Sequence, residues 1–262
     1  MTLLLLAHLL VAAVILTALR SRPRLAAFLG IGVLLASATT TALLSARPTQ
    51  ATESWEWIGE LGLRIDLALD GMATLMVLVI SLLGAIVLWY SINYFSDHVA
   101  YVRFVGIFVI FAGAMSGLVM SADLFTMFVF WELTSVCSFL LIGMNDESAS
   151  ARASALRALL VTGAGGLCLL AGVTLFQIAA GTSSFTELAA QSPSGTLITV
   201  AALLALVGAF TKSAQFPFHF WLPGAMSAPT PVSAYLHSAT MVKAGIVLIA
   251  RLAPIVGHDD IW

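Results

Sequence analysis

Residues 124–143 read LFTMFVFWELTSVCSFLLIG. The stretch is long enough to cross a bilayer as an α-helix, which needs about 20 mostly apolar residues. Its only charged residue is Glu132. A charge at the centre of a bilayer costs roughly 2.5–3.5 kcal/mol, and such groups usually face a partner or a wet cavity. The stretch therefore predicts a membrane helix in which an ionisable group has a purpose.

The composition of the whole chain supports a membrane protein. Of its 262 residues, 60% are hydrophobic and only 9% are charged, with a mean hydropathy of +1.04; soluble domains are about 25% charged. The formal net charge of −2 leaves no basic surface for nucleic acid. Cys137 and Cys168 lie in apolar stretches, which favours buried, inert thiols over a disulfide or a metal site.

Eight segments are apolar and long enough to span a bilayer: residues 3–19, 25–46, 67–92, 103–121, 123–144, 157–180, 195–216 and 232–253. We therefore expect an all-α polytopic membrane protein. The short connections leave no room for a soluble catalytic domain, and no nucleotide loop, metal-ligand spacing or nucleophile pattern is present. We expect no enzyme activity in the chain alone, no catalytic residues and no cofactor. The longest polar insert, residues 47–66, is expected to be an external loop.

The arginines predict the orientation. The first apolar segment precedes its basic cluster, whereas a signal peptide has the reverse order, so we interpret it as a retained membrane helix. With the N-terminus outside, the cytoplasmic side receives Arg20, Arg22, Arg24, Arg103, Arg152 and Arg157, and the outer side receives Arg47, Arg64 and Arg251. This agrees with the positive-inside rule. We expect a multi-pass protein of the cell membrane, in a bacterial inner membrane.

Two stretches interrupt the apolar pattern. Residues 215–231, QFPFHFWLPGAMSAPTP, contain four prolines and one glycine. Because proline removes a backbone donor and clashes with the preceding turn, the seventh helix is predicted to end or unwind near Phe216–Pro217, with hydrated backbone close to Lys212. Residues 162–168, TGAGGLC, contain small residues that favour a closely packed helix face.

Four ionisable residues lie within the predicted helices: Glu132, Lys212, His237 and Lys243. A change in the distance between a buried carboxylate and a buried lysine changes the proton affinity of both, which moves a proton. A histidine adds a group that titrates near neutral pH. The set predicts proton movement, while a plain Glu–Lys link between two helices is the competing interpretation.

Other residues are weaker candidates for lining a channel: His219, Asp123, Ser238 and Thr240. His219 suits a membrane interface equally well, and Asp123 suits the N-cap of the fifth helix. In a continuous eighth helix, Lys243 would lie ~9 Å along the axis from His237. Ser238 and Thr240 could then join the two through a hydroxyl or water chain. We interpret His8 as structural and Asp70 as a residue near the start of the third helix.

Two long motifs carry a resemblance. DLFTMFVFWELTSVCSFLLIG, residues 123–143, and KSAQFPFHFWLPGAMSAPTPVSAYLHSATMVKAG, residues 212–245, resemble the antiporter-like proton-channel family. This family includes large membrane subunits of complex I and of Mrp-type multisubunit Na⁺/H⁺ antiporters. Within it, the motifs are most similar to the A-type subunit of the Mrp-type antiporters, because complex I relatives tend to lack a lysine at position 243.

The resemblance implies a role for each buried ionisable residue. Glu132 and Lys212 match the charge-coupled pair of helix five and the discontinuous helix seven. His237 matches the helix-eight histidine that passes protons onward, and Lys243 matches the additional lysine of the Mrp subunits. The implied activity is exchange of Na⁺, or another monovalent cation, for protons. The implied partners are other membrane subunits of a hetero-oligomeric complex.

The resemblance also implies a domain layout. Residues 1–102 would hold three helices and an external loop, residues 103–253 the first five-helix repeat, and residues 254–262 a truncated tail. The chain stops before the second repeat of the family and is expected to be a truncated or split portion with one half-channel. The alternative function is a proton-pumping subunit of a redox-driven complex, such as complex I or a membrane hydrogenase.

Overall fold

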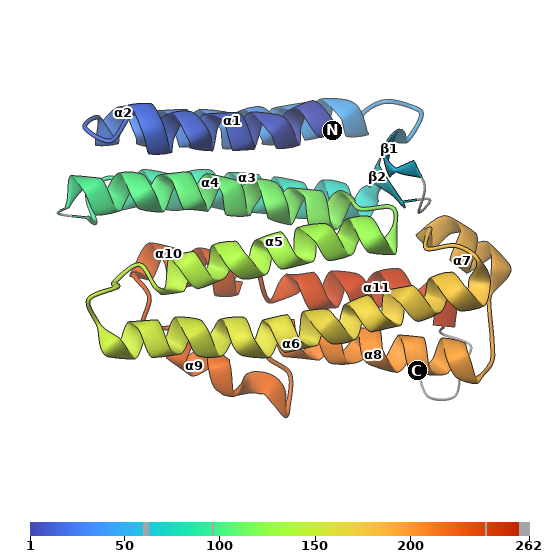
Figure 1. Ribbon diagram of the computed structural model, residues 1–262. Helices are drawn as coiled ribbons and strands as arrows, with labels where there is room; N and C mark the ends of the chain where they lie inside the picture. Colours follow the sequence, from blue (N-terminus) through green and yellow to red (C-terminus); the bar gives the residue numbers. More distant parts are fainter. Residues whose placement is uncertain (60–62, 96, 239, 257–262) are drawn as a thin grey trace.

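The computed structural model describes residues 1–59, 63–95, 97–238 and 240–256. Most of these residues form helices that run side by side between two opposite ends of the molecule (Figure 1). Within the described part of the chain, six spans are long and apolar enough to cross a membrane. Two further apolar helices have 17 residues each, the lower limit for a span. Together they correspond to the eight predicted segments, and the expectation of a polytopic helical membrane protein is confirmed.

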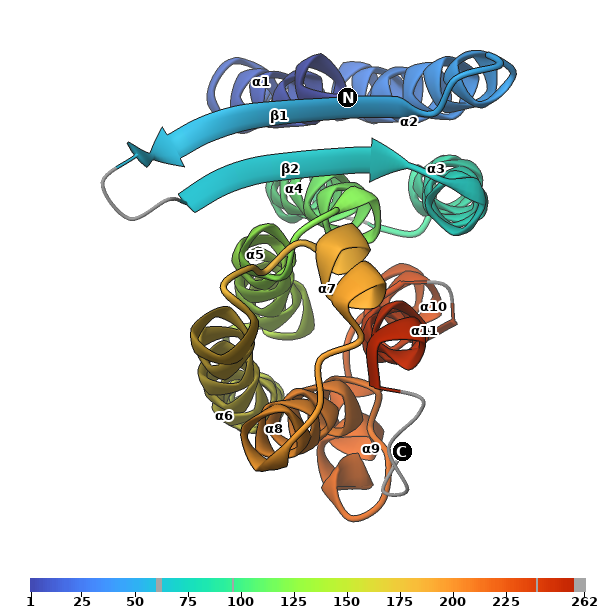
Figure 2. The ribbon, with the colours of Figure 1, turned by 90° about the vertical axis from the view of Figure 1, so that its right-hand side faces the viewer.

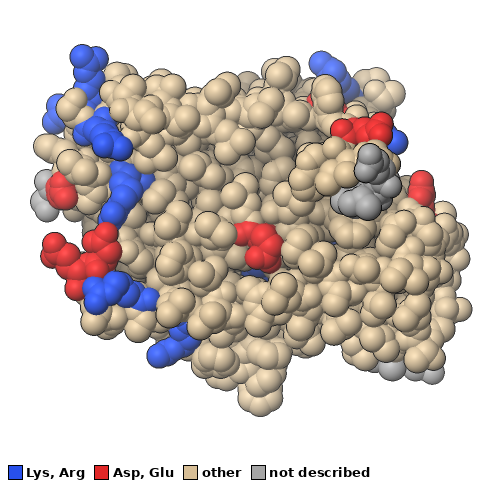
Figure 3. All heavy atoms as spheres, viewed as in Figure 1, with Lys and Arg blue, Asp and Glu red and all other residues tan. Residues whose placement is uncertain are grey.

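The helices and strands have the following bounds: α1 Thr2–Ala18, α2 Pro23–Ser45, β1 Ala51–Ile58, β2 Leu63–Leu69, α3 Gly71–Ser91, α4 His98–Met120, α5 Leu124–Ile142, α6 Ala149–Ala180, α7 Phe185–Gln191, α8 Thr196–Lys212, the 3₁₀ turn η2 Phe218–Trp221, α9 Leu222–Ala225, α10 Thr230–Ser238 and α11 Lys243–Val256. Charged side chains gather at the two ends, and a broad apolar belt separates them (Figure 3).

Helix α4 forms the centre of the N-terminal half, with nearly every side chain after its first turn buried. Two glycines let α1 approach it closely. A Cβ at Gly106 would lie 2.5 Å from the side chain of Leu16, and one at Gly113 would lie 2.8 Å from His8. These contacts pair an early residue of α1 with a late residue of α4, so the two helices pack antiparallel.

The polar insert forms a β-hairpin, not a loop. Strand β1 pairs antiparallel with β2, and the hairpin lies across the ends of α1 to α4 (Figure 2). Its strands contain the β-branched and aromatic residues Thr52, Trp55, Trp57, Ile58 and Ile65, which suit strands. Strand β2 continues to Leu69, so the third helix begins at Gly71 and the predicted start at residue 67 is wrong. Asp70 caps this helix by accepting a hydrogen bond from the N–H of Ala73 at 2.7 Å.

The C-terminal half arranges α5, α6, α8, α10 and α11 in a ring when viewed from one end (Figure 2). Helices α6 and α8 touch through glycines on both partners. A Cβ at Gly165 would lie 1.8 Å from Thr211 Oγ1, and one at Gly208 would lie 2.9 Å from the carbonyl oxygen of Gly165. The predicted packing face of residues 162–168 is therefore confirmed.

The seventh predicted helix is interrupted, as expected, but it ends before the proline. Helix α8 stops at Lys212, and Ala214 takes a left-handed conformation with φ 51°. The N–H of Gln215 donates to the carbonyl of Phe210 at 2.9 Å, and the indole of Trp221 donates to the carbonyl of Thr211 at 2.9 Å. These bonds satisfy the last carbonyls of the helix.

The expectation of one continuous eighth helix over residues 232–253 is wrong. Helix α10 ends at Ser238, and α11 begins at Lys243. The hydroxyl of Thr240 donates to the carbonyl of Tyr235 at 2.8 Å, which gives the backbone an alternative to the helical ladder. The carbonyl of Val242 accepts a hydrogen bond from Ser213 Oγ at 2.6 Å. The two interruptions are thus bonded to each other.

Candidate functional site

Lys212 is the last residue of α8, and its side chain is completely buried. Its ammonium donates to the carbonyl of Trp131 at 2.6 Å and to Ser135 Oγ at 2.9 Å. It also lies 4.6 Å from the centre of the Trp131 ring, within cation–π range. Because Trp131 and Ser135 are four residues apart, one turn of α5 presents both to Lys212. These contacts are all with neutral groups.

Glu132 follows Trp131 in α5 but faces α6. A Cβ at Gly166 would lie 1.9 Å from its Oε1 atom. This oxygen is buried and has no hydrogen-bond partner among the described residues. Within that part of the chain, no ion pair of 4.0 Å or less joins Glu132 to Lys212, although their charges interact. The acid and the base therefore lie on neighbouring helices without direct contact.

Glu132 lies near the middle of α5. It is the only acidic residue within the long helices, and it is only partly covered by this chain. Figure 3 shows acidic atoms in the middle of the otherwise apolar belt. A carboxyl group in such surroundings is costly to leave unpaired. Packing alone therefore does not account for a carboxyl group at this depth in the apolar belt.

Gly166 was missed as a site residue by sequence reasoning. The small residues at 162–168 indicated packing, which Gly165 performs against Thr211. Gly166 instead leaves the space that the Glu132 carboxylate occupies. Only the register between α5 and α6 reveals this second use. Trp131 and Ser135, by contrast, could have been identified from the sequence, because a spacing of four residues places both on one face of the helix that carries Glu132.

His237 lies in the last turn of α10, and both of its ring nitrogens are buried without a hydrogen-bond partner among the described residues. Its ring centre lies 6.0 Å from that of Trp221. The indole of Trp221 in turn donates to the carbonyl of Thr211, the residue before Lys212. Trp221 therefore connects the end of α8 to His237. Because buried polar atoms without a partner are uncommon, the two ring nitrogens mark His237 as a candidate functional residue.

Lys243 is the first residue of α11, so its expected position in the middle of a helix is wrong. It is partly buried, and its ammonium makes no hydrogen bond within the described part of the chain. The hydroxyl chain expected between His237 and Lys243 is not formed there either. Ser238 is exposed and donates to the carbonyl of Ala234, while Thr240 donates to the carbonyl of Tyr235.

The remaining candidates separate into one buried residue and two exposed ones. Asp123 caps α5 by accepting from the N–H of Thr126 at 2.9 Å, and Ser183 donates to its other oxygen. It also lines a polar cavity of about 430 Å³ near the hairpin, with Asp66 among the lining residues. His219 is exposed and stacks on Phe216, with ring centres 6.0 Å apart. Pro217 is exposed in the interruption after α8.

Within the described residues, no group of three or more His, Cys, Asp or Glu side chains is placed to hold a metal ion. Cys137 and Cys168 are both free thiols. The candidate residues are therefore a carboxylate, two lysines and a histidine, of which the structure brings Glu132 and Lys212 onto neighbouring helices and His237 beside Trp221.

Comparison with known families identifies the class of protein. Residues 121–262 match the family model described as "NADH:quinone oxidoreductase/Mrp antiporter, TM", and residues 55–105 match "NADH-Ubiquinone oxidoreductase (complex I), chain 5 N-terminus". The first match covers more than half of the chain. The chain therefore belongs to the family of transmembrane subunits shared by the quinone oxidoreductases and the Mrp antiporters.

Among individual proteins, the chain is similar to antiporter subunits. The chain is 46% identical over 214 residues to a Rhizobium meliloti protein named as a probable K⁺/H⁺ antiporter subunit of the A/B type, covering 79% of this chain and 21% of that protein. It is 45% identical over 210 residues to a Staphylococcus haemolyticus protein named "Putative antiporter subunit mnhA2", covering 78% of this chain and 26% of that one. The chain thus spans about a quarter or less of the curated relatives it matches.

Solved structures agree with this similarity. The chain superposes on one chain of the Mrp complex from Dietzia sp. with a TM-score of 0.88 and 38% identity, over 98% of this chain and 28% of that one. It shares its fold, at 23% identity and a TM-score of 0.82, with a chain of an archaeal membrane-bound sulfane sulfur reductase. That match covers 96% of this chain and 52% of the other.

Proposed function

We propose that this chain is a proton-conducting part of one subunit in a multisubunit cation/proton antiporter, and that it exchanges Na⁺ for H⁺ across the membrane. The observation that carries the proposal is the environment of Lys212. Its ammonium is buried in the membrane region and bound to two neutral oxygens, while Glu132 on the same turn of α5 keeps an unpartnered oxygen. The names and structures of the relatives support the antiporter assignment.

The proposed mechanism moves a proton by changing which group Lys212 faces. An ammonium bound to neutral oxygens has no counter-charge that fixes it in place, whereas an ammonium that reaches Glu132 gains a direct ion pair. Alternation between the two positions changes how readily Lys212 releases its proton. Trp221 joins the backbone beside Lys212 to the ring of His237, which accepts the proton next.

Lys243 is the proposed last group of the relay in this chain. Since the hydroxyls of Ser238 and Thr240 are used by backbone carbonyls, the step from His237 to Lys243 requires water. Asp123 and the polar cavity beside it would serve as a hydrated approach from the hairpin end. Residues 1–102 and 103–253 are the proposed units, of which the second holds all four relay residues.

The proposed orientation places the N-terminus outside the cell membrane. Arg103 bonds to Asp146 and the carbonyl of Met144, and Arg24 and His98 line one cavity, so the predicted cytoplasmic arginines lie at one end of the helices. Arg64 lies on the hairpin at the opposite end. The proposed partners are the other membrane subunits of the antiporter complex and, for a chain with so many exposed apolar side chains, the lipid bilayer.

The test uses the intact complex that contains this chain, reconstituted in vesicles with an acidic interior. We expect added Na⁺ to dissipate the pH gradient, which a pH-sensitive dye reports, while choline does not. Larger dissipation by K⁺ than by Na⁺ would assign the transport to K⁺, the cation in the name of the Rhizobium relative. Proton movement that requires an electron donor and a quinone, with no response to either cation, would replace antiport by redox-driven pumping.

A further inference from the structure

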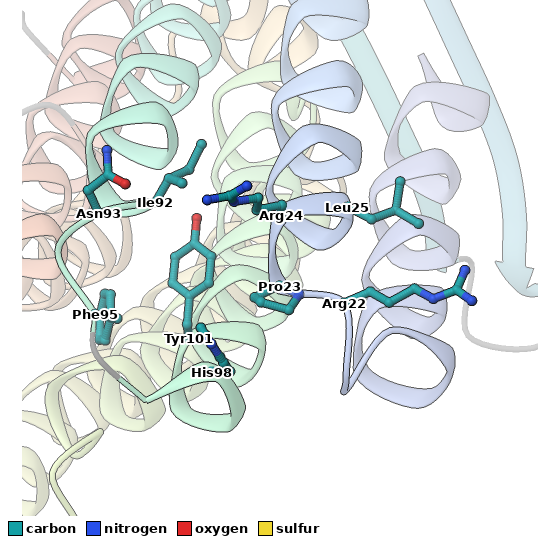
Figure 4. A pocket seen from close by; sticks show the side chains of 9 residues that line it. All are labelled: Arg22, Pro23, Arg24, Leu25, Ile92, Asn93, Phe95, His98 and Tyr101. Atoms are coloured by element: carbon teal, nitrogen blue, oxygen red, sulfur yellow. The ribbon is translucent and has the colours of Figure 1, made fainter.

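A cavity of about 680 Å³ opens at the end of the helices that carries the arginine-rich connection between α1 and α2. Figure 4 shows that its lining comes from Arg22 of this connection, from the first turn of α2, from the residues after α3 and from the first turn of α4. The side chains that matter for its chemistry are Arg24, Leu25, Ile92, Asn93, His98 and Tyr101. None of the relay residues lines this cavity, so it is separate from the site described above.

The polar lining of the cavity is basic. It includes no Asp or Glu, and Arg24 forms no ion pair or hydrogen bond within the described part of the chain. In Figure 4, the guanidinium of Arg24 lies beside the Tyr101 hydroxyl, whereas that of Arg22 points away to the other side of α2. Asp97, next to His98, uses its carboxylate to cap α4 through the N–H of Val99. The Tyr101 hydroxyl is hydrogen-bonded to Ser91 Oγ at 3.3 Å. The cavity thus offers the unpaired guanidinium of Arg24 and no acidic side chain among its described lining residues.

The apolar surface beside the cavity has the composition of a membrane interface. Trp89 and Tyr90 are 63% and 57% exposed at the end of α3, and Phe28 of α2 packs edge-on against Trp89 with ring centres 6.2 Å apart. Exposed Trp and Tyr side chains gather at the level of lipid headgroups. Leu25 extends this apolar surface to the cavity itself.

We propose that the cavity binds the phosphate headgroup of an anionic phospholipid. Arg24 binds the phosphate, and Asn93 and His98 supply further donors around it. The acyl chains run along the exposed apolar side chains of α2 and α3. The proposal depends on the chemistry of the cavity and its level in the membrane, and it holds whether or not the complex performs antiport. In the proposed orientation the lipid belongs to the cytoplasmic leaflet, which attracts basic segments through its anionic lipids.

The experiment measures lipid binding to the purified, delipidated complex by native mass spectrometry. Phosphatidylglycerol is compared with phosphatidylcholine, and glycerol 3-phosphate serves as a free phosphate without acyl chains. We expect phosphatidylglycerol to be retained at least fivefold better than phosphatidylcholine, which is about the effect of one basic side chain at a membrane surface. Glycerol 3-phosphate is expected to bind far more weakly, because it lacks the apolar contacts.

Matched variants locate the binding site. Arg24→Gln is expected to reduce phosphatidylglycerol retention about fivefold, to the level of phosphatidylcholine. Arg22 also lines the cavity, but its guanidinium points away from Tyr101 in Figure 4. Arg22→Gln should therefore reduce retention much less than Arg24→Gln. Arg24→Lys keeps a cation and reports on folding if Arg24→Gln fails to assemble; it should retain part of the preference.

Three outcomes would overturn the proposal. Equal losses in Arg22→Gln and Arg24→Gln would show a diffuse surface charge in place of a site. Equal retention of the two lipids by the wild-type complex would show that another subunit fills the cavity or that no headgroup is selected. Binding of glycerol 3-phosphate as strong as that of phosphatidylglycerol would assign the site to a soluble phosphate compound.

Discussion

Two acid–base couples in this molecule join distant parts of the chain, and they are built differently. Asp70 caps α3 with one oxygen and accepts a hydrogen bond from Arg251 with the other. Arg251 also donates to the carbonyl of Val119 at 3.2 Å and lies 5.8 Å above the ring of Phe185. The second couple is Glu132 and Lys212. Its ammonium, on Lys212, bonds only to neutral oxygens.

The difference separates a structural couple from a candidate functional one. In the first, each carboxylate oxygen has a partner, and the couple fixes α11 to the start of α3 near the hairpin. In the second, a buried carboxylate oxygen and a buried ammonium lie near one another without a bond. Leaving such groups unpaired costs free energy that a purely structural link would recover. The arrangement is consistent with a pair that changes partners.

The largest expected effect tests the second couple. Lys212→Met keeps the length of the side chain and removes its charge, and Glu132→Gln removes the acid. We expect each variant to lower Na⁺-driven proton movement by about a hundredfold, which is the size of effect that proton-transfer groups reach. The measurement is the vesicle pH-gradient assay, with subunit content checked by native gel. Near-normal exchange in both variants, with a normal complex, would refute the relay.

Lys243 is expected to matter less, because it stands beyond the first transfer. Lys243→Met should reduce exchange by less than the hundredfold expected for Lys212→Met, since water must then carry the proton past His237 without a receiving base. The competing explanation is an ion pair with a carboxylate of a neighbouring subunit. It predicts loss of assembly in Lys243→Met, and recovery when that carboxylate is also neutralised. Normal exchange in a normally assembled variant would exclude both.

The first couple should respond in stability and leave transport intact. Asp70→Asn removes the ion pair and weakens the cap of α3. We expect the free energy of unfolding to fall by about 1–3 kcal/mol, less than the 3–5 kcal/mol of a fully buried pair, because both side chains are partly exposed. The measurement is the thermal midpoint of the complex, with exchange assayed well below it. Loss of exchange at full stability would mean that the couple belongs to the relay.

The smallest and most specific change is at Gly166. An alanine there would bring Cβ within 1.9 Å of Glu132 Oε1, so the carboxylate must move while the helices remain packed. We expect exchange to fall severalfold with stability changed by about 1 kcal/mol or less, the range of ordinary substitutions. Gly163→Ala is the control in the same helix, because nothing lies within 4 Å of its Cβ position. Equal effects of the two substitutions would contradict the assigned role of Gly166.

Most of the helices could be predicted from the sequence, because a membrane span is recorded in a single local property, a run of about 20 apolar residues. The same property marked Glu132 and Lys212 as exceptions. The hairpin was missed because polar alternation in a short segment resembles a loop, and because β2 is also held by residues far away in the sequence, with Leu67 pairing with Ser121. Neither Gly166 nor Trp221 could be identified, since their contacts depend on the register between helices.

The expected position of Lys243 failed for a related reason. An apolar stretch long enough to span the membrane does not record whether its backbone is continuous, and residues 232–253 contain no proline to signal the interruption. The end of α8, by contrast, was predicted within a few residues because Pro217 stands beside it. Helix α8 ends earlier than predicted, at Lys212, because Gln215 and Trp221 donate hydrogen bonds to the carbonyls of its last turn. These bonds depend on the tertiary structure and cannot be predicted from the local sequence.

The bond between Ser213 and Val242 makes the two interruptions a single joint. Gly245 strengthens this joint, since its Cβ position would lie 2.3 Å from the carbonyl oxygen of Ala209 and so brings the backbones of α8 and α11 into contact. Lys212 stands one residue before this joint and Lys243 one residue after it. A hinge motion that swings Lys212 away from Trp131 therefore also displaces Lys243, so that the first and last bases of the proposed route share one mechanical element.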